Sequence, residues 1–278
     1  MREWGREPIN RPYGLRNPCL KHINGATVPP SRGLFCASPR HPPEYERRSI
    51  IPPVPPPKRH PYDQWSPDAR ALDLVGDKWT LLIIRDLAAG PRRFVELQRV
   101  LPGISTEQLR SRLNRMVADG LLTRQRYREV PPRVDYELTE RSRELMPVLG
   151  ALARWGYDWT WTAPRSGEDV NLGAIFRLAP GLLAPPADLT GSVDLVVVGD
   201  HEDRIFRLWA ADGHVTISER PEGSADAVVT GSDEAWISAL GPDGAIGALD
   251  VEGQVGLAKT VLSGFAAAAT SRAAQRAA

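Results

Sequence analysis

The amino-acid sequence predicts an α+β protein with two folded domains behind a basic, proline-rich tail. Three observations carry this prediction. The chain has 278 residues, and a domain typically takes about 100–200. Apolar residues recur at helical spacing between residues 67 and 159, and short runs of strand type recur from residue 195 onward. Half of the 26 prolines lie within residues 1–60.

Residues 1–60 form the tail. Proline at this density removes amide donors, and the segment has no periodic apolar pattern, so we expect it to be disordered. It holds 11 Lys and Arg against 4 Asp and Glu, and its two cysteines, Cys19 and Cys36, are too few for a disulfide framework. Three interpretations stay open: a passive tail, a basic arm that touches DNA, and a translation start assigned too far upstream.

The charge is divided unevenly along the rest of the chain. Residues 61–162 carry 16 basic and 14 acidic side chains, whereas residues 163–262 carry 6 and 16. Within the first block, residues 92–133 hold 10 basic and 4 acidic side chains. Such a basic strip is typical of a polyanion-binding face, with an ordinary solvated surface as the alternative. The acidic block is expected to repel both DNA and anionic membranes.

Several classes of protein are excluded at this stage. The longest apolar runs fall far short of the ~18 residues that cross a bilayer, and the N-terminus lacks the apolar region of a secretory signal. We therefore expect a soluble, cytoplasmic protein without membrane partners. The sequence has no glycine-rich phosphate loop, no Cys/His ligand cluster and no serine nucleophile elbow. It predicts no enzyme, no metal and no cofactor.

The first folded domain reads as three helices, a hairpin and a last helix. The third helix has Ser105 as its expected N-cap, Gln108 as the capping-box partner and Gly120 as its stop. A turn joins the two strands of the hairpin, and Thr139 is expected to cap the last helix. The expected elements are helices Asp68–Ala89, Phe94–Leu101 and Thr106–Asp119, strands Leu122–Arg128 and Arg133–Leu138, and a helix through Trp159. This is the order of a winged helix-turn-helix.

The third helix carries the candidate DNA-reading face. At about 100° per residue, Leu109, Leu113 and Met116 point inward. The opposite side offers hydroxyl, amide and guanidinium groups that suit base edges and phosphates, although a solvated polar face remains the alternative. The candidate DNA-binding residues of this helix and its cap are Ser105, Thr106, Gln108, Arg110, Ser111, Arg112, Asn114 and Arg115.

The hairpin repeats the basic pattern. Arg124, Arg126 and Arg128 alternate at period two and share one strand face, and Arg133 follows the turn. Arg126, Arg128 and Arg133 therefore join the candidate DNA-binding residues. Helix, hairpin and charge agree, so double-stranded DNA is the predicted partner.

These residues carry a resemblance to a known family. The segments LDLVGDKWTLLIIRDL from Leu72, GPRRFVEL from Gly90, LPGIS from Leu101 and EVPPRVDYELT from Glu129 resemble the HxlR family of winged-helix transcriptional regulators. The resemblance covers about residues 65–160. It implies a homodimer on two half-sites, held together by the first and last helices of this domain. Some members carry a redox-sensing cysteine before the first helix, but Trp65 stands in that neighbourhood here, so thiol sensing is not expected.

The acidic half reads as a strand series followed by helices. Ser232 is expected to cap a short helix through Leu240. Glycine and aspartate turns separate the strands at roughly ten-residue spacing. The expected elements are strands Leu195–Val198, Arg204–Ala210, His214–Glu219 and Ala227–Thr230, a turn or short strand Val251–Gln254, and a final helix Val255–Ala269.

This half resembles the sterol carrier protein type 2-like lipid-binding domain. The resemblance rests on the strand series, on Asp226–Asp233 before a Trp-bearing helix, and on Leu249–Leu257. It implies a sheet covered by helices around an apolar tunnel for a fatty-acyl or other hydrophobic molecule. Plain core packing is the alternative for each candidate. The candidate pocket residues are Phe206, Leu208, Trp209, Trp236, Leu240, Leu257, Val261 and Phe265.

Taken together, the sequence predicts an α+β chain with a tail (1–60), a winged helix-turn-helix domain (61–162) and a sterol-carrier-like sheet-and-helix domain (168–270). The predicted function is a DNA-binding transcriptional regulator that binds an inverted-repeat operator as a homodimer, with modulation by a hydrophobic ligand in the second domain. The alternative is a lipid-binding carrier whose winged helix serves dimerisation or protein contact.

Overall fold

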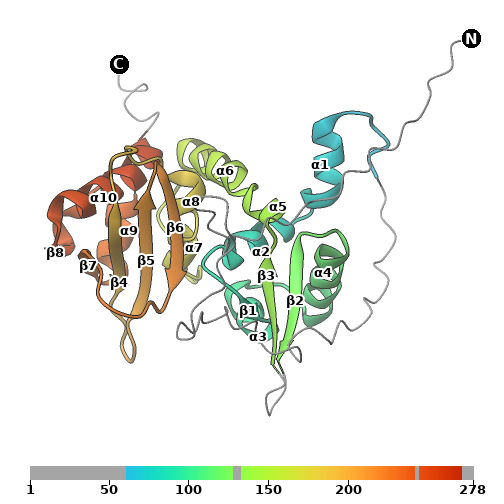
Figure 1. The fold of residues 1–278 in the computed structure, drawn as a ribbon, viewed down its shortest axis with the longest axis horizontal. Coiled ribbons are helices and arrows are strands. Elements are labelled where there is room, and N and C mark those ends of the chain that lie inside the picture. Colours follow the sequence, from blue (N-terminus) through green and yellow to red (C-terminus); the bar gives the residue numbers. More distant parts are fainter. Residues whose placement is uncertain (1–60, 128–132, 242–243, 271–278) are drawn as a thin grey trace, which may run out of the picture. The chain divides into compact units, whose positions relative to one another are not determined.

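The computed structural model describes residues 61–127, 133–241 and 244–270, apart from the side chains of Ala267, Ala269 and Thr270. The predictions for the tail lie outside the described residues. Within them, the chain folds around two hydrophobic cores. Figure 1 labels the helices and strands of the chain. The first core draws its buried residues from Val75 to Leu149, and the second draws them from Tyr157 to Ala268.

The first core is covered by helices and a small antiparallel sheet. The sheet has the order β1-β3-β2, with β2 and β3 as the hairpin. In chain order the elements are α1 (Pro67–Val75), α2 (Thr80–Leu87), β1 (Arg92–Arg93), α3 (Phe94–Val100), α4 (Thr106–Ala118), β2 (Leu122–Tyr127), β3 (Arg133–Leu138), α5 (Glu140–Arg143) and α6 (Met146–Trp159). The winged-helix arrangement is therefore confirmed.

The prediction of one helix over Asp68–Ala89 is wrong. Helix α1 ends at Val75 and α2 starts at Thr80. Asp77 lies between them, and its carboxylate accepts hydrogen bonds from the backbone N–H groups of Trp79 (2.9 Å) and Thr80 (3.1 Å). These bonds satisfy amide donors at the start of a new helix, so the chain turns there. The apolar spacing hid the break because both helices face the same core.

The prediction of one helix from Thr139 through Trp159 is also wrong. Helix α5 ends at Arg143, and α6 starts at Met146 with Pro147 in its first turn. Pro147 has no N–H to donate to the carbonyl of Arg143, which favours a new helix start at this point. The Thr139 hydroxyl does not cap α5 and instead donates to the carbonyls of Gly120 (2.9 Å) and Leu121 (3.2 Å).

The second core is covered by a five-stranded mixed sheet and helices. The sheet order is β6-β5-β4-β7-β8, with β4 and β7 parallel and the other pairs antiparallel. The elements are α7 (Leu172–Phe176), α8 (Ala179–Leu182), β4 (Gly191–Val197), β5 (Arg204–Ala211), β6 (His214–Glu219), β7 (Ala227–Gly231), α9 (Asp233–Leu240), the 3₁₀ turn Ile246–Ala248, β8 (Asp250–Gly253) and α10 (Val255–Thr270). The sequence predicted these strands but missed α7 and α8.

Aromatic rings hold the middle of the second core. Phe176 of α7 contacts Phe206 (5.3 Å between ring centroids), Trp236 (4.9 Å) and Phe265 (6.2 Å), all edge-on. Edge-to-face pairs at these spacings add to the gain from burial alone. The indole N–H of Trp236 donates to the Val196 carbonyl at 2.9 Å, so the ring is fixed to β4.

Helix α6 contributes to both cores. Met146 and Leu149 belong to the first core, and Tyr157 belongs to the second. Gly150 lies so close to α8 that a Cβ added there would come within 1.9 Å of the Gly181 carbonyl oxygen. Arg154 donates to that carbonyl (3.3 Å) and to the next one (2.9 Å). Only glycine permits this approach, so α6 and α8 form a close joint.

The opposite side of α6 is apolar and exposed. Four large side chains on it, which we call the apolar stripe, are each about half exposed. At about 100° per residue they fall within about 60° of one another. The stripe consists of Val148, Leu152, Trp155 and Trp159. Leu72 of α1 is also about half exposed, and Trp65 is almost fully exposed.

Candidate nucleic-acid interface

Helix α4 starts with a reciprocal capping pair. The Ser105 hydroxyl accepts from the Gln108 backbone N–H (3.2 Å), and the Gln108 side-chain oxygen accepts from the Ser105 backbone N–H (3.1 Å). Gly103 has φ +83°, a left-handed conformation that glycine adopts easily, and it turns the chain just before the cap. The predicted capping box is confirmed, and it fixes the start of the helix.

The orientation of α4 is as predicted. Leu109, Leu113 and Met116 are buried in the first core. On the other side Gln108 is exposed, whereas three residues further along are half-buried: Ser111, Asn114 and Arg115. We call these four residues the reading face. In the described part of the chain, the side chains of Ser111 and Asn114 have no hydrogen-bond partner, so their polar groups are available to a ligand.

Other candidates on α4 are held by neighbours. Arg110 forms an exposed ion pair with Glu107 (2.9 Å), and such pairs add little to stability. Arg112 pairs with Asp77 (2.9 Å), and both side chains are about three-quarters buried. Thr106 accepts a hydrogen bond from Gln98 of α3 (2.7 Å). Arg112 and Thr106 therefore position α4 against the preceding helices.

The arginines of the hairpin differ in exposure and in contacts. Arg126 is exposed opposite Val134. Arg133 donates to the buried Asp135 carboxylate (2.8 Å) and lies 5.2 Å from the Tyr127 ring centroid. Of the remaining candidates, Arg128 lies outside the described residues.

Arg124 covers an aromatic ring of the adjacent strand. Its guanidinium lies 5.9 Å from the centroid of the Tyr136 ring. Burial raises the pKa of the Tyr136 hydroxyl, whereas the positive charges of Arg124 and Arg110 lower it.

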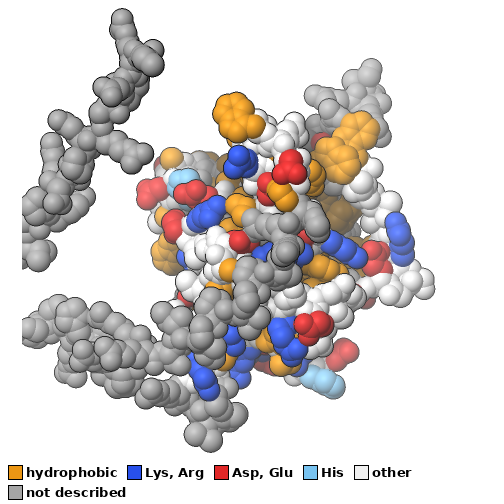
Figure 2. Space-filling model, turned by 90° about the vertical axis from the view of Figure 1, so that its right-hand side faces the viewer, with side chains coloured by type: hydrophobic (Ala, Val, Ile, Leu, Met, Phe, Trp, Pro, Cys, Tyr) orange, Lys and Arg blue, Asp and Glu red, His pale blue; other side chains and the backbone are white. Residues whose placement is uncertain are grey.

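Figure 2 shows one face of the molecule. Large hydrophobic side chains lie at its upper edge, Lys and Arg side chains are spread across it, and several of these basic side chains gather near its lower end.

The candidate pocket residues of the second half mostly lie in its core. Trp236, Phe265, Leu208 and Leu240 are almost fully buried, whereas Trp209 is about half exposed. Phe206, Leu257 and Val261 are buried in the same cluster. Of the eight, Leu240 lines a cavity of about 400 Å³. We call this the junction cavity. It lies between the end of α6, the following segment and helices α7 and α9, and its other walls come from residues outside the predicted set.

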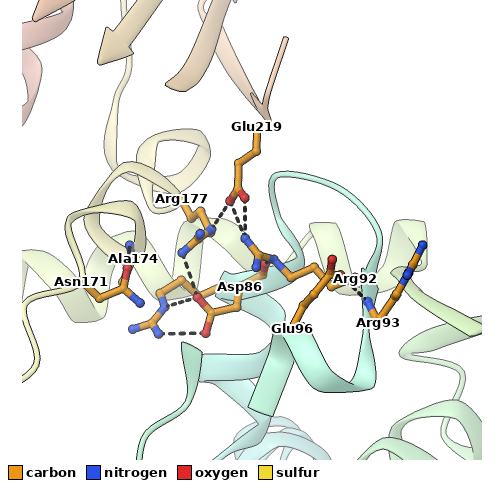
Figure 3. A network of polar contacts seen from close by, with 9 residues as sticks. Asp86, Arg92, Arg93, Glu96, Asn171, Ala174, Arg177 and Glu219 are labelled. Carbon is orange, nitrogen blue, oxygen red and sulfur yellow. Dashed lines mark hydrogen bonds and ion pairs between the residues drawn. The ribbon is translucent and has the colours of Figure 1, made fainter. Parts of the chain in front are cut away.

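A buried group of charges joins the two halves (Figure 3). Asp86 of α2 is fully buried and pairs with Arg177 (3.2 Å), which follows α7 and is also buried. Arg177 donates to Glu219 of β6 (2.6 Å), and Glu219 also accepts from Arg92 of β1 (2.5 Å). Arg85 completes the group by donating to Asp86 (3.0 Å). We call these five residues the junction network.

Burial lowers the pKa of Arg177, whereas the nearby Glu219 and Asp86 raise it. Arginine keeps its charge even so, because its ordinary pKa exceeds 12. None of the five residues of this network is among the candidate site residues that the sequence predicted. A signal was present, since Asp86 interrupts the apolar run Leu81–Leu87 and Arg177 interrupts the run Ala174–Ala179.

The fold and capped helix define the class of a winged helix-turn-helix protein, and comparison with known proteins gives the family. HxlR-like helix-turn-helix proteins match residues 74–163. An uncharacterized HTH-type transcriptional regulator of Synechocystis sp. is 44% identical over 93 residues, which cover 34% of this chain and 69% of that protein. The chain belongs to the HxlR-like helix-turn-helix family through this segment.

Two further proteins are similar to this chain. An uncharacterized HTH-type transcriptional regulator of Halalkalibacterium halodurans is 43% identical over 94 residues, which cover 34% of this chain and 83% of that protein. A solved structure of the redox regulator HypR in its reduced form is 37% identical and covers 33% of this chain and 90% of that chain, with a TM-score of 0.32.

Neither a membrane-spanning helix nor a metal-binding cluster occurs among the residues that the structure describes. No helix among them has the length and apolar character that a membrane crossing requires. Among the same residues, no group of three or more His, Cys, Asp or Glu side chains is arranged to hold a metal ion.

Proposed function

We propose that this chain is a DNA-binding transcriptional regulator that acts as a homodimer on an inverted-repeat operator. The reading face of α4 carries the proposal. It presents amide, hydroxyl and guanidinium groups on a capped helix whose other side is anchored in the core. Relatives named HTH-type transcriptional regulators support the same function.

The proposed contacts divide into base readers and phosphate contacts. Gln108 and Asn114 carry amides that suit adenine, and Arg115 carries a guanidinium that suits guanine. Thr106, Arg110 and Ser111 lie beside them on α4, and Ser105 lies at its N-cap. Arg126 and Arg128 of the hairpin are proposed to contact phosphates. Arg112 and Arg133 are proposed for a smaller share, because their guanidiniums also hold Asp77 and Asp135.

The apolar stripe of α6 supports the homodimer. Four large apolar side chains in one row, each about half exposed, favour association with another apolar surface. A two-fold axis along this surface would place two copies of α4 on one duplex. Half-site centres are then expected about one helical turn apart.

We also propose that residues 168–270 form a sterol-carrier-like domain and that a hydrophobic ligand modulates DNA binding through it. A five-stranded mixed sheet covered by α9 and α10 supports this domain. The carrier alternative makes the winged helix a module for dimerisation or protein contact, and it requires no sequence-specific DNA binding. The two functions are therefore separated by a DNA-binding measurement.

The test starts by selecting genomic fragments that the purified full chain retains. The retained site is then titrated by fluorescence anisotropy. Asn114→Ala and Arg115→Ala are each expected to weaken binding to this site by about 1–3 kcal/mol and to relax base preference. Arg126→Ala is expected to weaken binding to all sequences alike and to lower the log–log salt slope by about 0.9.

Arg204→Ala is the matched control, since it removes the same charge from an exposed pair on the second half. It should leave both affinity and salt slope unchanged. Selection of no common site, or wild-type affinity in the Asn114 and Arg115 variants, would contradict the proposed function and favour the carrier.

A further inference from the structure

The junction cavity has the size and the walls of a small-molecule site. Its volume of about 400 Å³ lies within the range of known ligand pockets. Ile175 of α7 and Leu178, two residues after that helix, line the cavity. Ile237 and Leu240 of α9 also line it. Tyr157 adds an aromatic surface from the last turn of α6. The apolar part of the wall therefore comes from α6, α7 and α9, and the segment between α6 and α7 supplies the polar part.

Tyr157 supplies a polar group that lacks a partner. Only 8% of its surface is exposed, and its ring packs 4.7 Å from that of Trp161. Its hydroxyl forms no hydrogen bond with any residue that the structure describes. Among those residues no fully enclosed side-chain oxygen lacks a partner, so this hydroxyl is accessible, and Tyr157 lines the cavity. Burial raises the pKa of Tyr157 to about 12, so the hydroxyl stays protonated and able to donate near neutral pH.

The rim of the junction cavity carries more acidic than basic groups. Glu168 and Asp169 lie there with Arg165, within the acidic half of the chain. This balance disfavours an anionic head group such as a fatty-acid carboxylate. A neutral molecule avoids that repulsion and also avoids burying a charge against apolar walls.

We propose that the junction cavity binds a small, uncharged, planar aromatic molecule whose hydrogen-bond acceptor faces the hydroxyl of Tyr157. Its ring packs against Trp161 and the apolar side chains of α7 and α9. The existence of this site is independent of the proposed function. Its effect on DNA affinity, however, rests on that function.

The walls of the cavity connect it to the winged helix. Arg177 lies between the cavity residue Leu178 and the helix that carries Ile175, and it holds Asp86 of α2 and Glu219 of β6. Arg92, which shares Glu219, lies opposite Tyr136 in the hairpin sheet. A ligand that displaces α7 therefore acts on side chains that reach α2 and the hairpin.

The test uses the full chain without DNA and the neutral fluorophore prodan, a naphthalene that carries a carbonyl acceptor. We expect saturable binding at one site per chain with a blue-shifted emission. Tyr157→Phe removes only the hydroxyl and is expected to weaken binding about 5-fold. Gly156 lines the cavity, and a Cβ there meets only Thr160 Oγ1 at 3.7 Å. The Cβ of Gly156→Leu is therefore accommodated, and the rest of the leucine side chain should occupy the cavity and abolish binding.

Gly256→Leu is the matched control, because it makes the same substitution on α10 where a Cβ meets nothing within 4 Å. Circular dichroism confirms that each variant is folded. The site is overturned if prodan does not bind, if Gly156→Leu binds like the wild type, or if Gly256→Leu abolishes binding equally.

DNA affinity is measured afterwards, with and without saturating prodan. A change of about 5- to 150-fold is expected for coupled sites, and an unchanged affinity would overturn the coupling. If prodan binds but the chain selects no operator, the proposed function fails and the ligand site stands.

Discussion

Asp86 is the residue whose replacement tests the junction network most directly. The network brings three guanidiniums, Arg85, Arg92 and Arg177, together with two carboxylates, Asp86 and Glu219. Its formal charge is therefore +1. Asp86→Asn raises this to +2, whereas Arg177→Met lowers it to zero.

The two substitutions should therefore differ in cost. Asp86→Asn leaves the buried Arg177 with one fewer anion, and breaking a buried pair in this way costs about 3–5 kcal/mol of unfolding free energy. Arg177→Met leaves Asp86 paired with Arg85 and Glu219 paired with Arg92. Its cost should be nearer to that of lost charge-assisted hydrogen bonds, about 1.5–3 kcal/mol.

Urea unfolding followed by circular dichroism and tryptophan fluorescence measures both values. Asp233→Asn is the control, because Asp233 pairs with Arg204 on the surface and exposed pairs contribute about 1 kcal/mol or less. An equal or reversed order of Asp86→Asn and Arg177→Met would refute the charge argument. A cost below about 1 kcal/mol for Asp86→Asn would refute the structural role of the network.

Three further predictions concern α6. Gly150→Ala should destabilise the fold by about 1–3 kcal/mol in thermal unfolding. The reason is that the added Cβ would lie 1.9 Å from the Gly181 carbonyl oxygen. Gly156→Ala in the same helix is the control and should be neutral or stabilising. Trp155→Glu in the apolar stripe should shift the mass in sedimentation equilibrium from dimer to monomer, and an unchanged mass would argue against a dimer through this face. The folded pKa of Tyr157 of about 12 exceeds its unfolded value of about 10, so the unfolded chain loses the phenolic proton first. Stability should therefore fall by about 1.4 kcal/mol per pH unit between about 10 and 12, and Tyr157→Phe should remove this part of the slope.

The parts of the fold that depend on local pattern could be predicted from the sequence. Helix α4 is an example, because the Ser105–Gln108 pair and the apolar spacing of Leu109 and Leu113 act within one helix. The strands of the second half were predictable for a similar reason. Their alternating residues and turns specify a strand wherever its partner lies in the chain.

The helix breaks show where local pattern is insufficient. Apolar spacing continued across Asp77 and Pro147, so it indicated long helices in both places. The turn at Asp77 depends on its carboxylate bonding the backbone ahead, and that choice competes with helix continuation. Pro147 was a visible signal, but a proline is compatible with the first turn of a helix as well as with its end.

The contacts between the two halves could not be predicted from sequence periodicity. Arg177 and Asp86 are 91 residues apart, and Arg92 and Glu219 are 127 apart. No spacing rule relates such pairs, and a lone charge in an apolar run indicates only that some partner exists. The junction cavity has the same origin, because its walls meet only after α6, α7 and α9 have packed.

Helix α6 connects the joint with α8, the junction cavity and the apolar stripe. Its Gly150 and Arg154 hold α8, its Tyr157 lines the junction cavity, and its far side presents the apolar stripe. A packed helix shifts as a unit because its backbone hydrogen bonds and side-chain contacts resist local deformation. Any displacement at Tyr157 therefore reaches the stripe on the same helix. If that stripe holds the proposed dimer together, the spacing of the two reading faces becomes sensitive to the occupant of the cavity even if the junction network stays intact.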